Sequence, residues 1–143
     1  MINSSEISTI FQSTELFIVL VIFLFTLFYQ DIQNSINTKL ADGDIENKRN
    51  RNKVRSIFWG KNFVLVITTS LVICLLIPVF CSIVSSLSKL TSDYSIYSFV
   101  LIFIFLLGFF IWSIWLSYKI LKNIKKLGGY NKLDTLKYVF IGK

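Results

Sequence analysis

Three long apolar runs without a charged residue constrain the fold of this chain more than any other feature. They are Leu16–Gln30, Asn62–Ser88 and Tyr94–Tyr118. Of the 15 Lys and Arg residues, all but one lie in the segments Asp31–Lys61 and Lys119–Lys143. About 20 apolar residues in a helix cross the hydrocarbon core of a bilayer. The pattern therefore predicts an all-α integral membrane protein with three transmembrane helices.

The spans are expected to form one membrane domain over residues 1–143, since the hydrophobic fraction of 54% exceeds that of average soluble chains. Their expected limits are about residues 10–29, 62–87 and 94–118. The first apolar run alone is short, so a full crossing begins near Ile10 and includes Glu15. Glu15 then lies just inside the outer boundary, either as an interfacial carboxylate or as a candidate intramembrane carboxylate.

The positions of the basic residues predict how the chain is oriented. Loops that stay in the cytoplasm carry an excess of Lys and Arg, so residues 31–61 and 119–143 are expected in the cytoplasm and the N-terminus outside. The same rule accounts for the net charge of +7, and no nucleic acid is expected as a partner. The first residues lack the basic region of a cleavable signal peptide, which favours an uncleaved anchor. We expect a bacterial cytoplasmic membrane, with an organellar inner membrane as the alternative.

The segment 31–61 is expected to be a cytoplasmic helical hairpin between the first two spans. Ala41–Asp44 interrupts its helical pattern, because Gly43 permits a left-handed backbone and Asp44 is a fair N-cap. Its cations are expected to contact anionic headgroups or a partner, together with three lysines of the tail. These residues are Lys48, Arg49, Arg51, Lys53, Arg55, Lys122, Lys125 and Lys126.

The tail 119–143 is expected to begin as a basic amphipathic extension of the third span. Gly128 and Gly129 should end that helix, and Asn131 could cap a last short one. Leu133, Leu136 and Phe140 would form the apolar side of this last helix. A segment of this kind is expected on the inner leaflet, or as a docking helix for another protein.

The second span carries a stripe of small or compact residues at helical spacing. With one glycine of the third span, they form the predicted helix-packing face: Ser70, Cys74, Pro78, Cys81, Ser85 and Gly108. Small residues let helix backbones approach closely in lipid. The stripe packs on the first and third helices, or it faces a pore or a partner. Pro78 should also kink the helix.

Residues that commonly carry chemistry are scarce in the apolar runs. The chain has no histidine, and its two cysteines lie seven residues apart in one run. On a helix this spacing separates them by roughly 10 Å, too far for an intrachain disulfide. We therefore expect no enzyme, no catalytic, cofactor-binding or metal-binding residue, and no cofactor.

Two classes of function remain from the sequence. The first is a non-enzymatic accessory protein, subunit or immunity-type factor that binds a membrane partner through helix–helix contacts, with anionic lipids as further partners. The alternative is a homo-oligomeric pore-former. In size, three spans and a basic tail the chain resembles holins, which implies such an effector. The resemblance concerns architecture and assigns no residue roles.

Overall fold

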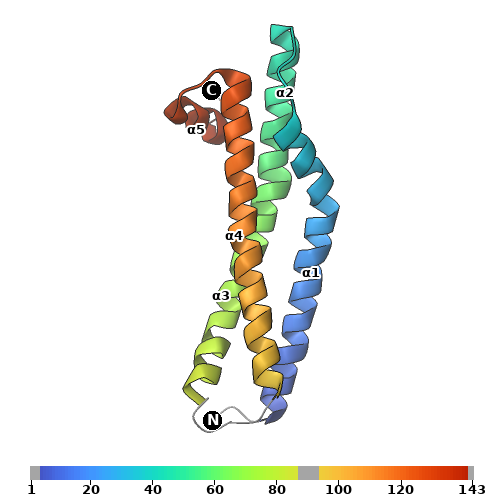
Figure 1. Cartoon of the computed structure of the whole chain (residues 1–143), viewed down its shortest axis with the longest axis vertical. Helices are drawn as coiled ribbons and strands as arrows, with labels where there is room; N and C mark the ends of the chain where they lie inside the picture. Colours follow the sequence, from blue (N-terminus) through green and yellow to red (C-terminus); the bar gives the residue numbers. More distant parts are fainter. Residues whose placement is uncertain (1–3, 87–93, 142–143) are drawn as a thin grey trace.

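The structure is a computed structural model that describes residues 4–86 and 94–141, and every regular element in these ranges is helical. The predicted turn at Ser88–Asp93 lies outside the described residues. The helices, in chain order, are α1 (Ser4–Asn37), α2 (Asp44–Ile57), the π-helix η1 (Phe58–Asn62), α3 (Phe63–Ser86), α4 (Tyr94–Gly128) and α5 (Lys132–Ile141) (Figure 1).

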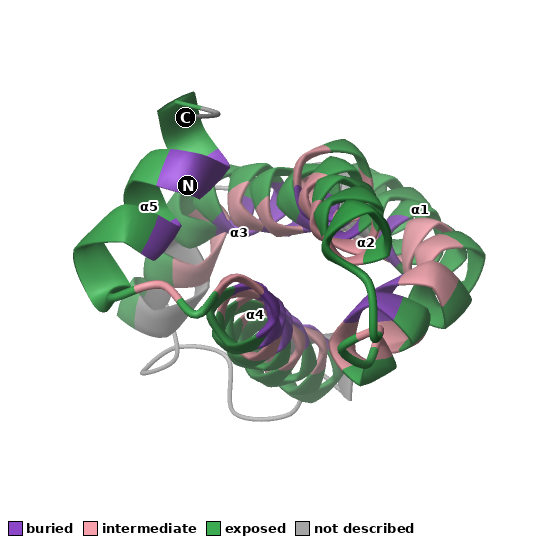
Figure 2. Ribbon diagram, turned by 90° about the horizontal axis from the view of Figure 1, so that it is seen from above, coloured by how far each residue is buried: buried purple, intermediate pink, exposed green. Residues whose placement is uncertain are grey.

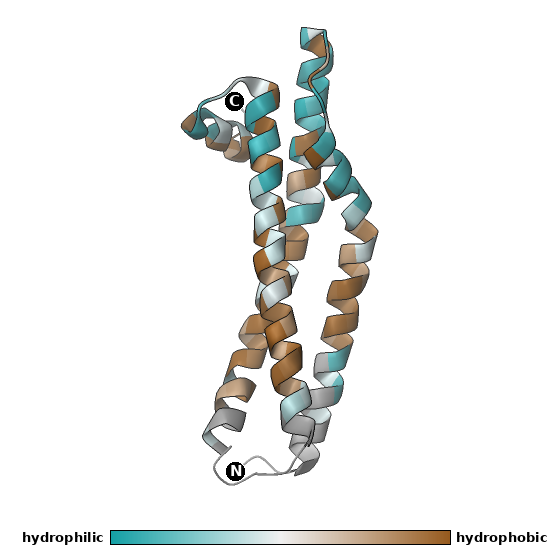
Figure 3. Cartoon of the chain, viewed as in Figure 1, coloured by the Kyte–Doolittle hydropathy of each residue, from teal (hydrophilic) through white to brown (hydrophobic). Residues whose placement is uncertain are grey.

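Three helical stretches are long and apolar enough to cross a membrane, which confirms the all-α class and the three apolar spans. They lie within Glu15–Asn37, Asp44–Cys81 and Tyr97–Gly128. α1 and α4 run in the same direction, and α3 runs against both (Figure 1). The hydrophilic residues gather at the end of the bundle that carries α2 and α5 (Figure 3). We call this end, formed by residues 31–61 and 119–141, the polar end.

Two clusters of buried side chains hold the bundle together, and they lie on the inward sides of the helices (Figure 2). One cluster joins α1, α3 and α4 in the apolar part, with Val21, Leu76 and Phe99 among its members. The other joins all the helices at the polar end, with Ile32, Val54 and Val139 among its members. Large apolar side chains, among them Leu16, Leu71 and Leu101, are exposed on the outside of the bundle.

The second span is continuous with the basic helix before it. α2 passes through η1 directly into α3, and α3 continues through Pro78 to Ser86. A π-helix adds one residue to a turn and so shifts the direction in which the following side chains point. Phe58 and Asn62 are both buried, whereas Trp59 contacts α5 and Lys61 contacts α1.

The connection between α1 and α2 differs from the sequence expectation in its details. Gly43 is the N-cap in an extended conformation, with φ −117° and ψ 138°, and Asp44 is already helical. The side chain of Asn47 fixes the turn instead. It accepts a hydrogen bond from the Ala41 N–H at 2.7 Å and donates one to the Ala41 carbonyl at 2.8 Å.

Candidate functional site

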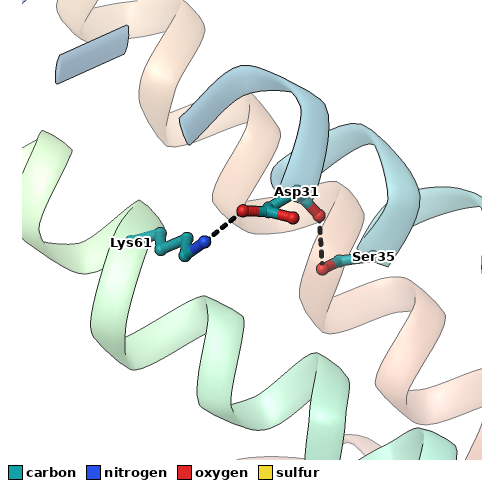
Figure 4. Close-up of polar contacts among 3 residues, drawn as sticks. All are labelled: Asp31, Ser35 and Lys61. Carbon is teal, nitrogen blue, oxygen red and sulfur yellow. Dashed lines mark hydrogen bonds and ion pairs between the residues drawn. The ribbon is translucent and has the colours of Figure 1, made fainter. Parts of the chain in front are cut away.

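Polar side chains join the helices where the apolar spans meet the polar end. Lys61 of η1 forms an ion pair with Asp31 of α1, and Figure 4 shows the two side chains pointing toward each other. Ser35 donates a hydrogen bond to the Asp31 carbonyl one turn away, at 2.8 Å. The Lys61 ammonium also lies 5.9 Å from the centre of the Phe28 ring. Both charged groups are partly exposed, so the pair positions the helices and adds little stability.

Two buried asparagines connect α4 to the other helices. Asn62 donates to the Ser117 hydroxyl at 2.6 Å. Asn123 donates to the carbonyls of Ser35 and Thr38, at 2.6 and 3.1 Å, at the end of α1. A buried amide needs such partners, so these contacts fix the register of the three helices.

Hydrogen bonds from four side chains hold Tyr130 and α5 against α2 and η1. The Val139 carbonyl accepts from Arg55 Nε at 3.1 Å and from the Trp59 indole at 2.8 Å. Tyr138 donates to the Asn52 side chain at 2.6 Å, and Arg51 donates to the Tyr130 hydroxyl at 3.1 Å. The tail therefore folds back on its own chain.

The Tyr138 hydroxyl lies in an environment that opposes its ionisation. Burial raises the pKa of Tyr138 above its ordinary value, and the neighbouring Tyr130 acts in the same direction. The guanidinium groups of Arg51 and Arg55 lower this pKa, but burial has the larger effect. The neutral phenol is thus the favoured form, and it donates the hydrogen bond to Asn52 of α2.

An open pocket of about 660 Å³ lies beside this contact. Its lining residues are Lys48, Arg51, Asn52, Arg55, Ser56, Trp59, Tyr130 and Tyr138. Of the α2 cations predicted to contact lipid or a partner, Arg55 is thus engaged with α5 and Arg51 with Tyr130, in the turn before α5. Lys48, Arg49 and Lys53 are exposed.

A second pocket, about 1150 Å³ in volume, lies between the polar part of α4 and α5, and we call it the lysine groove. Its cations include the three predicted tail lysines, Lys122, Lys125 and Lys126, which are exposed. The full lining is Ile36, Trp115, Tyr118, Lys119, Leu121, Lys122, Asn123, Lys125, Lys126, Gly129, Tyr130, Lys132, Thr135 and Leu136.

The amphipathic tail lies differently from the expectation for a helix on the leaflet. Ile120, Ile124 and Leu127 of α4 are buried in the core at the polar end. In α5 the buried residues are Thr135, Tyr138 and Val139, whereas the predicted apolar side is exposed. That exposed side consists of Leu133, Leu136 and Phe140. The expectation was wrong for the α4 part, because its apolar stripe packs on α1 and α2 instead of on lipid.

Most of the predicted helix-packing face is exposed. Cys74, Pro78, Cys81 and Ser85 are exposed, and Ser70 is half-buried. Leu65, Thr69, Val72, Ile73 and Leu76 form the buried side of α3 instead. We call Ser70, Cys74, Pro78, Cys81 and Ser85 the small-residue face. Cys74, Pro78 and Cys81 therefore do not take the predicted place against the first and third helices, because α3 turns the side that carries Leu65, Val72 and Leu76 toward them.

Two further predicted residues are exposed. Gly108 of α4 is exposed, and a Cβ added there would meet nothing within 4 Å. It is not a close-contact point inside the bundle. Glu15 is exposed near the start of the first apolar stretch.

Sequence reasoning missed the residues that hold the polar end together: Trp59, Asn123 and Tyr138. Asn123 lies between Ile120 and Ile124 in an apolar stripe, which indicates a buried polar residue but does not indicate its partners on α1.

The described residues contain no group of three or more His, Cys, Asp or Glu side chains that could hold a metal ion. The groups brought together at the polar end are cations, amides, hydroxyls and aromatic rings, which bind and position other groups. No protein-family model matches the chain, and no curated protein or solved structure shows significant similarity to it.

Proposed function

We propose that this protein is a non-enzymatic accessory protein, subunit or immunity-type factor that binds a larger membrane protein through the small-residue face of α3. The polar end holds α1, α2, α4 and α5 together and presents α3 in a fixed orientation. The partner lies in the membrane beside α3.

The observation that carries the proposal is the exposure of the small-residue face. Each residue turns an α-helix by about 100°, which puts Cys74 and Cys81 on nearly the opposite side of α3 from Leu65 and Leu76. The chain covers the leucine side with its own helices and leaves the cysteine side open. Association in lipid depends on close packing, for which such a surface is suited.

In the proposed arrangement the protein lies in a bacterial cytoplasmic membrane with the polar end in the cytoplasm. The distribution of Lys and Arg supports this orientation. The exposed Lys48, Arg49 and Lys53 of α2 then lie beneath the inner leaflet, within reach of anionic headgroups or of a cytoplasmic part of the partner.

Filling the small-residue face tests the proposal. In the double variant Cys74→Phe/Cys81→Phe two rings stand where the partner helix would approach. We expect the wild-type chain, purified from its own membrane in a gentle detergent, to retain a stoichiometric protein partner. The double variant should lose this partner, as measured by mass spectrometry of the purified complex.

The matched control is Val19→Phe/Ile22→Phe, which places two rings on exposed positions of α1, a helix that carries none of the small-residue face. This control should keep the partner. Equal loss from both variants would show that the face is not the contact surface.

The same exposed face also suits a second copy of the chain, as the homo-oligomeric pore-former requires. A monodisperse homo-oligomer without another protein would support this alternative. So would depolarisation of a bacterial membrane when the chain is produced alone. Growth with an intact membrane potential would argue against it.

A further inference from the structure

The lysine groove concentrates positive charge that the chain does not neutralise. Its five lysines are Lys119, Lys122, Lys125, Lys126 and Lys132. Within residues 4–86 and 94–141 the ion pair of the chain is that between Lys61 and Asp31, so none of the five has a carboxylate partner there. Lys119 instead lies 3.7 Å from the centre of the Trp115 ring. An anion bound here would relieve the mutual repulsion of these ammonium groups.

The groove has two walls because the chain reverses after α4. Gly129 has φ +63°, and the Tyr130 N–H bonds to the Lys125 carbonyl at 3.3 Å, which ends α4 and turns the chain back. α5 then supplies Thr135 and Leu136 to the far wall. The resulting volume of about 1150 Å³ is slightly above the range of typical small-molecule pockets.

The groove is amphiphilic, and its apolar side continues onto the lipid-facing surface of α4. Trp115 and Tyr118 line it and are largely exposed. Residues three or four positions apart share one side of a helix. The exposed residues in line with Trp115 toward the middle of the span are Ile111, Gly108, Ile104 and Leu101. In the other direction the same line leads to Lys119, Lys122 and Lys126.

We infer that the lysine groove binds an anionic phospholipid. The phosphate lies among the lysines between α4 and α5, and an acyl chain follows the exposed strip of α4 past Trp115 and Gly108. Gly108 leaves a notch in that strip, since nothing lies within 4 Å of a Cβ added there. A free phosphate ion would use only the lysines, whereas a phospholipid uses both parts of the groove. The site does not depend on which protein contacts the small-residue face.

Lipid retention by the full-length protein tests this inference. The protein in detergent is titrated with phosphatidylglycerol or with phosphatidylcholine, and bound lipid is counted by native mass spectrometry. We expect phosphatidylglycerol to bind at least about 10-fold more tightly. The variant Lys122→Gln/Lys126→Gln/Lys132→Gln should bind it about 100-fold more weakly, since each cation near an anionic headgroup contributes roughly fivefold.

The control Lys39→Gln/Lys137→Gln removes two exposed cations that lie outside the groove and are not among the α2 cations proposed to reach headgroups. It should change the affinity for phosphatidylglycerol by less than about threefold, because only distant charges are removed. A second variant, Lys122→Arg/Lys126→Arg/Lys132→Arg, keeps the charge and should keep the lipid. This second variant also separates loss of charge from loss of folding.

Three results would overturn the inference. Equal loss in the groove variant and its control would show diffuse attraction to the whole polar end. Equal affinity for the two lipids would show that the lysines do not select an anion. Displacement of phosphatidylglycerol by inorganic phosphate at a similar concentration would assign the groove to a free anion.

Discussion

At the polar end, side chains of one helix donate hydrogen bonds to carbonyls near the end of another helix. The last four carbonyls of a helix lack partners within it. Asn123 of α4 donates to the Ser35 and Thr38 carbonyls at the end of α1, and Trp59 donates to the Val139 carbonyl near the end of α5. Each of these side chains thus stabilises a terminus far away in the sequence.

Such long-range caps explain why these residues could not be assigned from the sequence. Local capping is recognisable because the cap and the helix end lie a few residues apart. Asn123 and Ser35 are 88 positions apart, and Trp59 and Val139 are 80 apart. Only the packed arrangement of the helices brings these pairs together.

Tyr138 makes the docking of α5 sensitive to alkaline pH. Its pKa is raised in the folded protein, mainly by burial, so folding favours the protonated phenol. The contribution of Tyr138 to stability is therefore fully present below its unfolded pKa, which is about 10, and is lost as the pH rises through the higher folded pKa. We expect the stability advantage of the wild type over Tyr138→Phe to disappear in that alkaline range.

Two measurements check this expectation. The difference between the 295 nm absorbance titrations of the wild type and Tyr138→Phe should show a phenol that ionises with a midpoint above 10. Thermal unfolding of both proteins should converge over the same interval. A midpoint at or below the ordinary tyrosine value would contradict the raised pKa.

At the scale of the elements, the sequence predicted where helices end better than which surfaces they contact. Gly128 and Gly129 ended α4 as expected, because a glycine with positive φ is a local requirement. The burial of Ile120 and Ile124 was not foreseen, since an amphipathic stripe has the same appearance whether it faces a leaflet or the same chain. The contacts of the small-residue face were not predicted either, since a stripe of small residues looks the same whether it faces the same chain or the outside of the bundle.

The turn at Gly129 decides whether α5 reaches its docking position. Gly129→Ala forces a Cβ into a left-handed backbone and should reduce the free energy of unfolding by about 1 kcal/mol. Hydrogen exchange in α5 should accelerate accordingly. The matched variant is Gly60→Ala, where a Cβ meets nothing within 4 Å and φ is ordinary, and its stability should be unchanged or slightly higher. Unchanged exchange in Gly129→Ala would show that the turn does not control docking.

At the scale of the whole molecule, the charge pattern was sufficient to predict an all-helical chain with three apolar spans. Lipid requires every backbone group to be satisfied within a helix, so the length of each apolar run largely determines the element. The length of an apolar run does not predict which side of α3 packs against Leu106 of α4 and which side is exposed. That choice depends on side-chain shape along several helices at once.

The proposed orientation is testable by thiol labelling in intact cells. In a background with Cys74→Ser and Cys81→Ser, single cysteines are introduced as Ser5→Cys, Ser92→Cys or Asn50→Cys. We expect an impermeant maleimide to label the first two and to label the third only after the cells are permeabilised. Labelling of Asn50→Cys in intact cells would reverse the orientation.

Because α2 continues through η1 into α3 without a break, movement of one end of this long helix is coupled to movement of the other end. At 1.5 Å per residue the helix from Asp44 to Ser86 is a rod of roughly 60 Å, held near its middle by the contacts of Trp59, Lys61 and Asn62. A tilt of about 10° around this fulcrum would move the far end of α2 by about 4 Å, and it would carry α5 along, since Asn52 and Arg55 of α2 are hydrogen-bonded to α5. A rearrangement beside α3 in the membrane would thus be transmitted to the basic tip of α2.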